Sequence, residues 1–265
     1  MQVLDLCREL SVEAVIPQSE VDKYSIAGAA SLATVVPDLD SVDVDIAVAL
    51  GGDGTILRAF SRFAGMQTPI IGFNFGRVGF LSAMGPDDIP AGLRSVLEGK
   101  YELIGLSLLE IVNKGESHLA INDIVVHKPE GGSVIHLAYA INGVEYDSFR
   151  CDGFVASTPA GSTAYNLSNG GPLVTLALDA FILTSIAPHV LRSRAMVLGP
   201  TDTLTIRNDS HGSQGTIYVD GRPSGSLAPG DEVLVSLAAR KAQLVQPPGA
   251  DFYRTLRDKF IKPAD

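Results

Sequence analysis

The sequence is poor in several features that would assign its class directly. Its 265 residues include two cysteines, no tryptophan, and 20 basic against 30 acidic residues, which leaves a formal net charge of −10. Cys7 and Cys151 are too few for a disulfide framework, and their spacing matches no zinc motif. The most apolar window, residues 172–191, is interrupted by an aspartate, a proline and a histidine, so it is a poor membrane span.

These deficits exclude several kinds of protein. A chain with an acidic excess is not expected to bind nucleic acid generally or to dock on a membrane through basic residues. The N-terminus has no basic segment followed by an apolar one, as a secretory signal would. We therefore expect a cytoplasmic protein that binds neither nucleic acid nor a membrane. An anionic substrate would need backbone N–H groups, a metal or a few arginines placed locally.

The first part of the chain alternates between buried strands and helices. The continuous apolar runs Ile46–Leu50 and Pro69–Phe73 are typical of strands buried on both faces of a parallel sheet. Helical patterns cover about Thr55–Phe63 and Asp87–Leu97. This order predicts an α/β layer.

The character of the sequence changes near Tyr101. Short β-prone runs separated by turn residues continue from there to Val245, and Asn142-Gly143 is a hairpin signal. We predict an α/β plus β fold, with an N-terminal α/β domain over residues 1–99 and a C-terminal β-sandwich over residues 100–247. Residues 248–265 contain a helical stretch, Asp251–Phe260, that we expect to complete the first domain. The short β-prone runs of the C-terminal domain are Leu119–His127, Val134–Ile141, Phe154–Ser157, Phe181–Ile186, Leu204–Arg207, Thr216–Val219 and Glu232–Leu237.

The sharpest local feature is the sequence GGDGT at Gly51–Thr55, where a buried strand ends and a helix begins. Glycines there let the backbone approach a ligand closely, and a helix N-terminus offers unpaired N–H groups to phosphate. The carboxylate of Asp53 would repel a bare phosphate, so it would instead orient a metal or take a proton from an attacking hydroxyl. The alternative is an aspartate that only caps the helix. The spacing matches neither the dinucleotide fingerprint nor the Walker loop.

Two further segments carry candidate ligand groups. In DGFVASTPAGSTAYN, Asp152–Asn166, a strand runs into a turn rich in hydroxyls, and Tyr165 could stack on a base or ribose; a simple capped turn is the alternative. Asn122-Asp123 interrupts an apolar strand, so a ligand, a bulge or a strand edge could partner it. His189 is read as a loop histidine and Asp220–Arg222 as a hairpin turn.

Together these segments closely resemble the NAD kinase family. Gly51–Thr55 is similar to its GGDGT motif, Asn74–Leu81 to its N-x-G-x-x-G-F-L segment, Asn122-Asp123 to its N-E/D motif and Asp152–Tyr165 to its DGxxxSTPxGSTAY signature. The likeness covers about residues 45–260 with the motifs in family order. Diacylglycerol, sphingosine and phosphofructo-kinases share versions of GGDGT, whereas the long signature is far more specific.

The resemblance implies a Rossmann-like N-terminal domain, a β-sandwich C-terminal domain, and a homodimer or homotetramer with NAD bound between domains. It implies transfer of the γ-phosphate of ATP, or of a phosphate of inorganic polyphosphate, to the 2′-hydroxyl of the adenosine ribose of NAD. The product is NADP. The family requires a divalent metal, usually magnesium.

The resemblance assigns Asp53 as the general base, with Phe75 as an apolar contact and Ala187 near the adenine. Arg58 lies about one turn into the helix after GGDGT, where it would face phosphate. This arginine, with Arg150 and Arg222, would offset the acidic net charge locally. The residues assigned to nucleotide binding are Gly51, Gly52, Gly54, Thr55, Arg58, Phe75, Asn122, Asp123, Arg150, Asp152, Thr163, Ala164, Tyr165, Asn166, Ser168, Ala187 and Arg222.

The chain departs from the family pattern in two places. The family begins with a β-strand and a turn, whereas this chain begins with the helical pattern Met1–Leu10, so either the first strand is missing or the start codon was assigned too late. A sheet without that strand would have an exposed edge, and ATP contacts from that turn would be absent. Arg222 stands where the family often has glutamine. The alternatives are a catalytically weak NAD-binding or regulatory protein, which the intact Asp53 disfavours, and a lipid kinase, which leaves the Ser157–Tyr165 stretch unexplained.

Overall fold

The chain forms two compact units. The computed structural model describes the chain except for residues 1, 40–41, 64–65, 77–78, 83, 247, 249–250 and 261–265, and only the backbone of residues 258–259. The first unit comprises Met1–Ile104 with Gln243–Asp265, and the second comprises Gly105–Ala242. The predicted domain boundaries, at residues 99/100 and 247/248, lie within five residues of the boundaries between these units. That the two units are separate folding domains stays a prediction.

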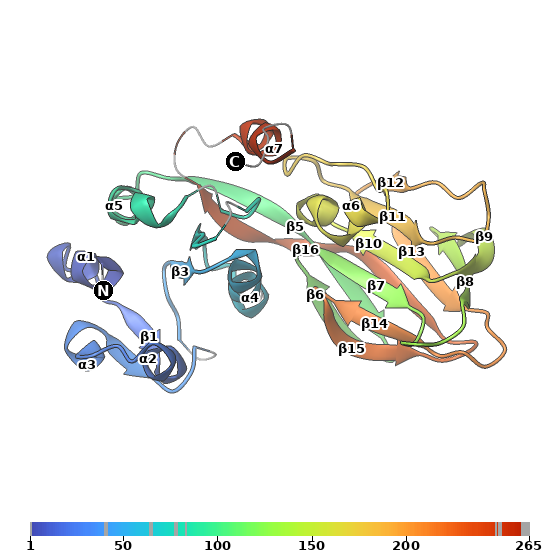
Figure 1. Ribbon diagram of the computed structural model, residues 1–265, viewed down its shortest axis with the longest axis horizontal. Coiled ribbons are helices and arrows are strands. Elements are labelled where there is room, and N and C mark those ends of the chain that lie inside the picture. Colours follow the sequence, from blue (N-terminus) through green and yellow to red (C-terminus); the bar gives the residue numbers. More distant parts are fainter. Residues whose placement is uncertain are drawn as a thin grey trace. The chain divides into compact units, whose positions relative to one another are not determined.

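The first unit is an α/β layer (Figure 1). β3 and β4 pair in parallel, with Ala47 opposite Ile70, and the end of β16 joins β4 in parallel where Leu244 meets Ile70. The elements are α1 (Gln2–Glu9), β1 (Val15–Pro17), α2 (Gln18–Tyr24), α3 (Ala29–Leu32), β2 (Thr34–Val36), β3 (Ala47–Leu50), α4 (Asp53–Phe63), β4 (Ile70–Phe73), η1 (Pro86–Asp88), α5 (Ile89–Leu97) and α7 (Phe252–Phe260).

The packing of this unit follows its apolar pattern. All four residues of β4 are buried, and Ile71 and Phe73 pack with Leu93 of α5 in one cluster. The predicted alternation of strands and helices is confirmed. The sequence did not predict the separate parallel pair β1–β2, whose strands have three residues each and no fully buried side chain.

The second unit is a sandwich of two antiparallel sheets (Figure 1). One sheet has the strand order β12-β11-β10-β7-β14-β15. The other has the order β16-β13-β8-β9, with β5 paired to β16 and β6 paired to β5. The elements are β5 (Glu102–Asn113), β6 (Glu116–Ala120), β7 (Asp123–His127), β8 (Ile135–Ile141), β9 (Val144–Cys151), β10 (Gly153–Ser157), η2 (Ala160–Thr163), α6 (Tyr165–Ser168), β11 (Phe181–Ile186), β12 (Met196–Leu198), β13 (Thr203–Asn208), β14 (Gly215–Val219), β15 (Arg222–Leu227) and β16 (Glu232–Gln246).

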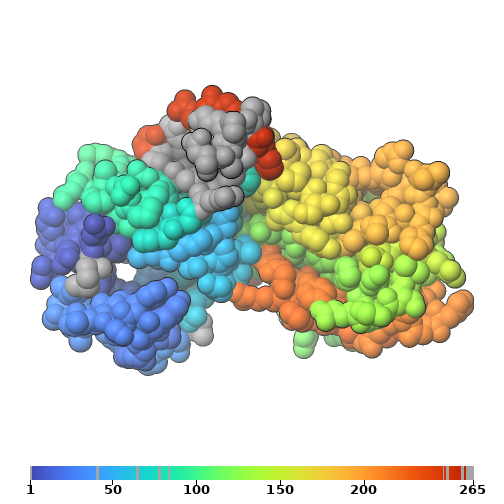
Figure 2. Space-filling view, in the orientation of Figure 1, coloured from blue at the N-terminus to red at the C-terminus, as the bar shows by residue number. Residues whose placement is uncertain are grey.

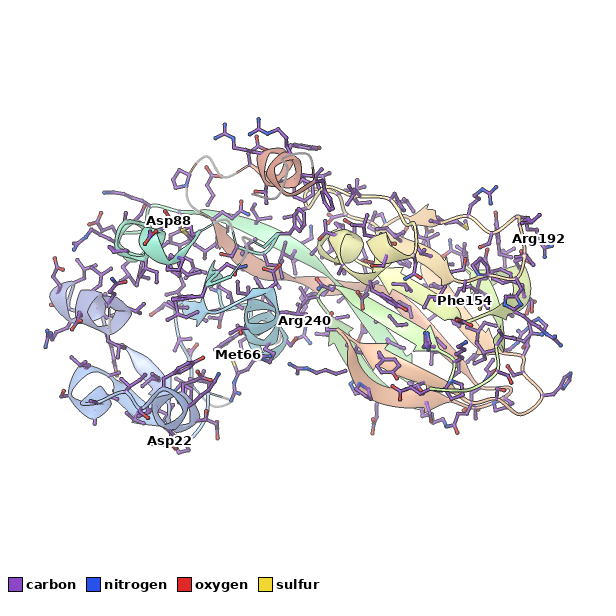
Figure 3. All side chains as sticks on the ribbon, in the orientation of Figure 1. Asp22, Met66, Asp88, Phe154, Arg192 and Arg240 are labelled. Carbon is purple, nitrogen blue, oxygen red and sulfur yellow. The ribbon has the colours of Figure 1, made fainter. Side chains whose placement is uncertain are left out.

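The core of the second unit lies between its sheets. Phe154 of β10, labelled in Figure 3, is 1% exposed and meets Tyr139 and Phe149 of the opposite sheet edge to face, at centroid distances of 5.3 and 5.5 Å. Aromatic pairs in this geometry each add roughly 1 kcal/mol beyond the area they bury. The predicted β-sandwich is therefore confirmed, as is the hairpin turn at Asn142-Gly143, where both residues have positive φ.

One predicted strand is wrong in a way that bears on function. The sequence reads Leu119–His127 as a single strand, but β6 ends at Ala120 and β7 begins at Asp123. β6 pairs with β5 in one sheet, and β7 pairs with β10 and β14 in the other. The chain therefore crosses from one sheet to the other at Ile121-Asn122, and this crossing breaks the apolar alternation.

The predicted helix near the C-terminus is α7, and its aromatic side chains pack within the first unit. The ring of Phe80 lies 6.1 Å from that of Phe252 and 6.0 Å from that of Phe260, measured between centroids. Among the helices that the structure describes, none has the length and apolar character needed to cross a membrane.

Candidate active site

Asp53 lies at the point where β3 gives way to α4. Gly51 and Gly52 form the bend after the strand, and Asp53 is the first helical residue, two residues before the predicted helix start. The N–H groups of Thr55 and Ile56 donate to the Gly52 carbonyl at 2.8 and 3.2 Å. The carboxylate is therefore presented at a helix N-terminus, where the backbone dipoles favour negative charge.

A buried amide fixes this carboxylate. The side-chain N–H of Asn74, which is 2% exposed, donates to Oδ1 of Asp53 at 3.0 Å. The side-chain oxygen of Asn74 accepts the N–H of Gly76 at 2.8 Å, which sets the orientation of the amide. Asn74 follows directly after β4, so neighbouring parallel strands supply the carboxylate and the group that holds it.

The backbone of Gly79 packs against the same carboxylate. A Cβ at this position would lie 1.4 Å from Oδ1 of Asp53, so no larger residue fits without displacing the aspartate. Both Asn74 and Gly79 thus contact Asp53, and the sequence analysis assigned neither as a site residue. The signal was present, because both belong to the N-x-G-x-x-G-F-L segment.

Two other predicted residues lie close to this helix start. The guanidinium of Arg58 donates to the Thr55 hydroxyl at 3.0 Å, one turn into α4. Phe75 is 55% exposed, and its N–H donates to the Gly51 carbonyl at 3.3 Å. An exposed aromatic ring held by its backbone in this way offers an apolar face to a ligand.

In the second unit, the crossing at Ile121-Asn122 is held by the turn after β10. The N–H of Thr158 donates to the Asn122 carbonyl at 2.9 Å, and its hydroxyl donates to the Ile121 carbonyl at 2.5 Å. A Cβ on Gly161 would lie 2.0 Å from the Asn122 carbonyl oxygen, so glycine is required for this close approach.

Asp220 holds the opposite side of the crossing. Its carboxylate accepts the backbone N–H groups of Ile121, Asn122 and Asp123 at 3.0, 2.7 and 3.2 Å. Its own N–H donates to the Asp123 carbonyl at 2.9 Å. The predicted hairpin turn at Asp220–Arg222 is confirmed between β14 and β15, but the sequence analysis missed this second role of Asp220.

The Asp123 carboxyl group is 5% exposed. Burial, and to a lesser degree the neighbouring charge of Asp220, raises the pKa of Asp123 to about 7. Among the residues that the structure describes, none forms a hydrogen bond with this carboxyl group. A buried carboxyl group with unused hydrogen-bonding capacity is a candidate ligand contact.

The segment from Thr163 to Ser168 exposes some of its residues in the yellow part of the second unit in Figure 2 and buries others. Tyr165 is 39% exposed, so its ring is available to a ligand and is not a core side chain. Asn166 is fully buried, and its side-chain amide is used within the protein. It donates to the carbonyls of Ser162 and Pro172 and accepts the hydroxyl of Thr184 at 2.7 Å. Thr163 ends η2, and Ala164 joins it to α6.

The remaining predicted residues lie at strand ends. Asp152, between β9 and β10, forms an ion pair of 2.8 Å with Lys128, which the sequence analysis did not identify. Arg150 is exposed near the end of β9, and Arg222 is exposed at the start of β15. Ala187 follows β11 with a φ of 42°.

No cluster of three or more histidine, cysteine, aspartate or glutamate side chains suited to a metal occurs in the described part of the chain. His189, read as a loop histidine, lies in the bend after β11, where its N–H donates to the Arg150 carbonyl at 2.8 Å. Magnesium commonly binds through one or two carboxylates together with substrate phosphates. The carboxylates of the site therefore do not amount to a preformed metal cage.

The sequence matches two family descriptions, ATP-NAD kinase N-terminal domain over residues 8–101 and ATP-NAD kinase C-terminal domain over residues 121–247. It is 38% identical over 229 residues to an NAD kinase of Ralstonia nicotianae, which covers 84% of this chain and 76% of the relative. An NAD kinase of Carboxydothermus hydrogenoformans is 32% identical over 245 residues, covering 90% and 88%.

Solved structures agree with these matches. Yeast NADH kinase in complex with NADH superposes with a TM-score of 0.86 at 26% identity, covering all of this chain and 84% of that one. An NAD kinase from Archaeoglobus fulgidus in complex with ATP gives 0.74 at 28% identity, covering 93% and 97%.

The first unit carries the Asp53 carboxylate at the start of α4, and the second carries the crossing at Ile121-Asn122. Together with the two family matches, these features define the class of the protein as a phosphotransferase. The matched relatives extend over most of the chain at 32–39% identity. The chain belongs to the NAD kinase family, and it is an enzyme that acts on NAD.

Proposed function

We propose that the protein transfers the γ-phosphate of ATP to the 2′-hydroxyl of the adenosine ribose of NAD, and so makes NADP. The observation that carries the proposal is the carboxylate of Asp53, held by Asn74 at the start of α4 and packed on Gly79. A hydroxyl is a poor nucleophile until a base accepts its proton, and a carboxylate fixed in one orientation can do so.

The start of α4 supplies the phosphate side of the site. Phosphoryl transfer asks the protein mainly to align the reactants and to stabilise charge. The backbone N–H groups of Gly52 and Gly54 and the guanidinium of Arg58 provide donors for that purpose. Gly51 and Thr55 shape the same turn, since their N–H groups donate to the carbonyls of Phe73 and Gly52. Magnesium would arrive with the phosphate donor and neutralise part of its charge.

The second unit supplies the groups that bind NAD. We assign hydrogen bonds with nucleotide hydroxyls or amides to Asn122, Asp123 and Asp152, and stacking to the exposed ring of Tyr165. The other assigned positions are Phe75, Arg150, Thr163, Ala164, Asn166, Ser168, Ala187 and Arg222. The ligands of the two superposed structures, NADH and ATP, support the binding of both nucleotides.

Three further proposals follow the family. We propose that the protein works in the cytoplasm as a homodimer or homotetramer. Light scattering during size-exclusion chromatography would measure the oligomeric state. We also keep inorganic polyphosphate as an alternative phosphate donor, because the site residues above bind phosphate groups that both donors share.

A coupled assay tests the proposal. The purified protein is incubated with NAD, ATP and magnesium, and an NADP-specific dehydrogenase reports the product. We expect NADP with ATP or, failing that, with polyphosphate. NAD binding by calorimetry without product from either donor would contradict the proposal and favour a binding protein.

Replacing Tyr165 by alanine should raise the Kd for NAD about tenfold or more, because stacking of a base on an aromatic ring contributes about 1–3 kcal/mol. The ring is 39% exposed, so the melting temperature should change little. Calorimetric titration measures the Kd. Tyr165→Phe is the matched control, since it keeps the ring and should keep the affinity. An unchanged Kd in Tyr165→Ala would remove the ring from the binding site.

Replacing Asn74 by alanine should lower kcat about tenfold, because a hydrogen bond to a charged group contributes about 1.5–3 kcal/mol. The loss should come from misorientation of Asp53, whose Oδ1 the amide holds at 3.0 Å. A double variant with Asp53→Asn distinguishes this from an independent effect. If the two losses multiplied in full, Asn74 would not act through Asp53.

A further inference from the structure

Asp220 makes an unusual set of contacts for a residue in a hairpin turn. It joins β14 to β15 with a φ of 48°, and its carboxylate accepts three consecutive N–H groups from a segment about a hundred residues earlier. Oδ1 accepts the N–H groups of Asn122 and Asp123, and Oδ2 accepts that of Ile121. An ordinary hairpin needs none of these bonds.

The segment that Asp220 holds is the crossing between the two sheets. Thr158 satisfies the carbonyls of Ile121 and Asn122 from the other side. Asp220 therefore binds the backbone N–H groups of the crossing, and Thr158 binds its backbone carbonyl groups. Within the described part of the chain, the side chains of Asn122 and Asp123 form no hydrogen bonds, so they are left for a ligand.

The carboxyl groups of Asp123, which is buried, and of Asp220, which is half-buried, influence each other here, and their surroundings differ. Burial raises the pKa of Asp220, while the three N–H donors and the guanidinium of Arg222 oppose that rise. Burial raises the pKa of Asp123 as well, and the charge of Asp220 raises it further. The three N–H donors stabilise the ionised form of Asp220, whereas no hydrogen bond within the described part of the chain stabilises the ionised form of Asp123.

We propose that Asp220 is a positioning residue for NAD, whose ionised carboxylate fixes the crossing so that the Asn122 and Asp123 side chains meet the nucleotide. This inference rests on the proposed function, since it assumes that these two side chains bind NAD. Asp220 contributes through the backbone that it holds and not by touching the substrate. Its loss should therefore weaken NAD binding more than it slows turnover at saturation.

The experiment compares Asp220→Asn and Asp220→Ala with the wild type by steady-state kinetics and by calorimetric titration with NAD. Asparagine keeps one acceptor oxygen and loses the charge, whereas alanine loses all three bonds. We expect the KM and Kd for NAD to rise about tenfold in Asp220→Asn and further in Asp220→Ala, in line with hydrogen bonds to a charged acceptor. The KM for ATP and the kcat at saturating NAD should stay within about twofold of the wild type.

Asp202 offers a matched control. Its carboxylate accepts the N–H of Gly199 at 2.7 Å and the side-chain amide of Asn142 at 2.7 Å, in a turn of the same unit that carries no assigned site residue. Asp202→Asn should lower the melting temperature without changing the Kd for NAD. An equal rise of the Kd in Asp202→Asn would show a general effect of stability and would overturn the assignment to Asp220.

The pH profile gives a second readout, because it reports the charge that Asp220 places beside Asp123. We expect the KM for NAD of the wild type to change through the pKa of Asp123, about 7. Asp220→Asn removes the facing negative charge, so the same inflection should move to lower pH. Arg222 is the other charged group beside the pair, and it stays in place. An inflection unmoved in Asp220→Asn would contradict the inference.

Other outcomes separate this inference from the proposed function. A wild-type protein that binds no NAD would refute both, whereas tight binding by the wild type and by a folded Asp220→Asn variant alike would refute only the role of Asp220. If both variants fail to fold, amide exchange of the wild type decides. The N–H groups of Ile121, Asn122 and Asp123 should exchange slowly, and fast exchange would overturn the inference.

Discussion

Replacing Asp53 by asparagine should lower kcat by roughly a hundredfold or more, which is the usual contribution of a well-placed general base. Asparagine has the same shape, so it can still lie against Gly79 and near the Asn74 amide. It has no carboxylate to accept the proton of the 2′-hydroxyl. The Kd for NAD should therefore stay close to that of the wild type. The coupled assay and calorimetric titration measure the two quantities.

The matched control is Asp87→Asn, which removes an exposed carboxylate of the same unit that lies in η1. Its kcat should equal that of the wild type. A kcat of Asp53→Asn within a few-fold of the wild type would exclude Asp53 as the base. A large rise in the Kd for NAD would instead assign the carboxylate to substrate binding.

Replacing Gly161 by alanine should destabilise the second unit by about 3 kcal/mol, at the upper end of the effects of overpacking. The added Cβ would lie 2.0 Å from the Asn122 carbonyl oxygen and 2.5 Å from its carbon. These are backbone atoms held by Thr158 and Asp220, so they cannot yield as a flexible side chain would. Urea unfolding followed by circular dichroism measures the change in the free energy of unfolding.

The same substitution should raise the Kd for NAD about tenfold or more, because a displaced crossing misplaces Asn122 and Asp123, and each lost hydrogen bond contributes about 1 kcal/mol. Gly212→Ala is the control, since a Cβ at that exposed position meets no atom within 4 Å. Its free energy of unfolding should change by less than about 0.5 kcal/mol. Equal stability of the two variants would show that the turn after β10 can retreat from Asn122.

The sequence predicted the parts of the fold that depend on local apolar pattern. β3 and β4 are continuous apolar runs between turn residues, so both strands were predicted. Burial on both faces is confirmed for β4 but is wrong for β3, where Leu50 is 40% exposed. The three-residue strands β1 and β2 were missed because strands so short carry too few residues for a pattern. The single strand predicted at Leu119–His127 was wrong, because hydropathy cannot show that a chain changes sheets between two apolar stretches.

The sequence likewise predicted the site residues that stand in local motifs and missed those that depend on contacts between distant segments. Asp53 and Tyr165 stood in motifs whose residue types already indicate chemistry. The role of Asp220 depends on a contact with a segment 97 to 99 residues away, and no local pattern indicates such a contact. The supporting role of Gly79 depends on a missing side chain, which sequence spacing alone does not distinguish from an ordinary turn glycine.

The long separation between Asp220 and the crossing also affects how the protein is made. Synthesis proceeds from the N-terminus, so Ile121 and Asn122 leave the ribosome well before the β14–β15 hairpin exists. Until the hairpin is present, the N–H groups of the crossing have no carboxylate to bind, and closing so long a loop is slow. A chain truncated before residue 220 would thus lack a fixed crossing even if its earlier strands had paired, so the crossing reaches its final form only after the β14–β15 hairpin has been made.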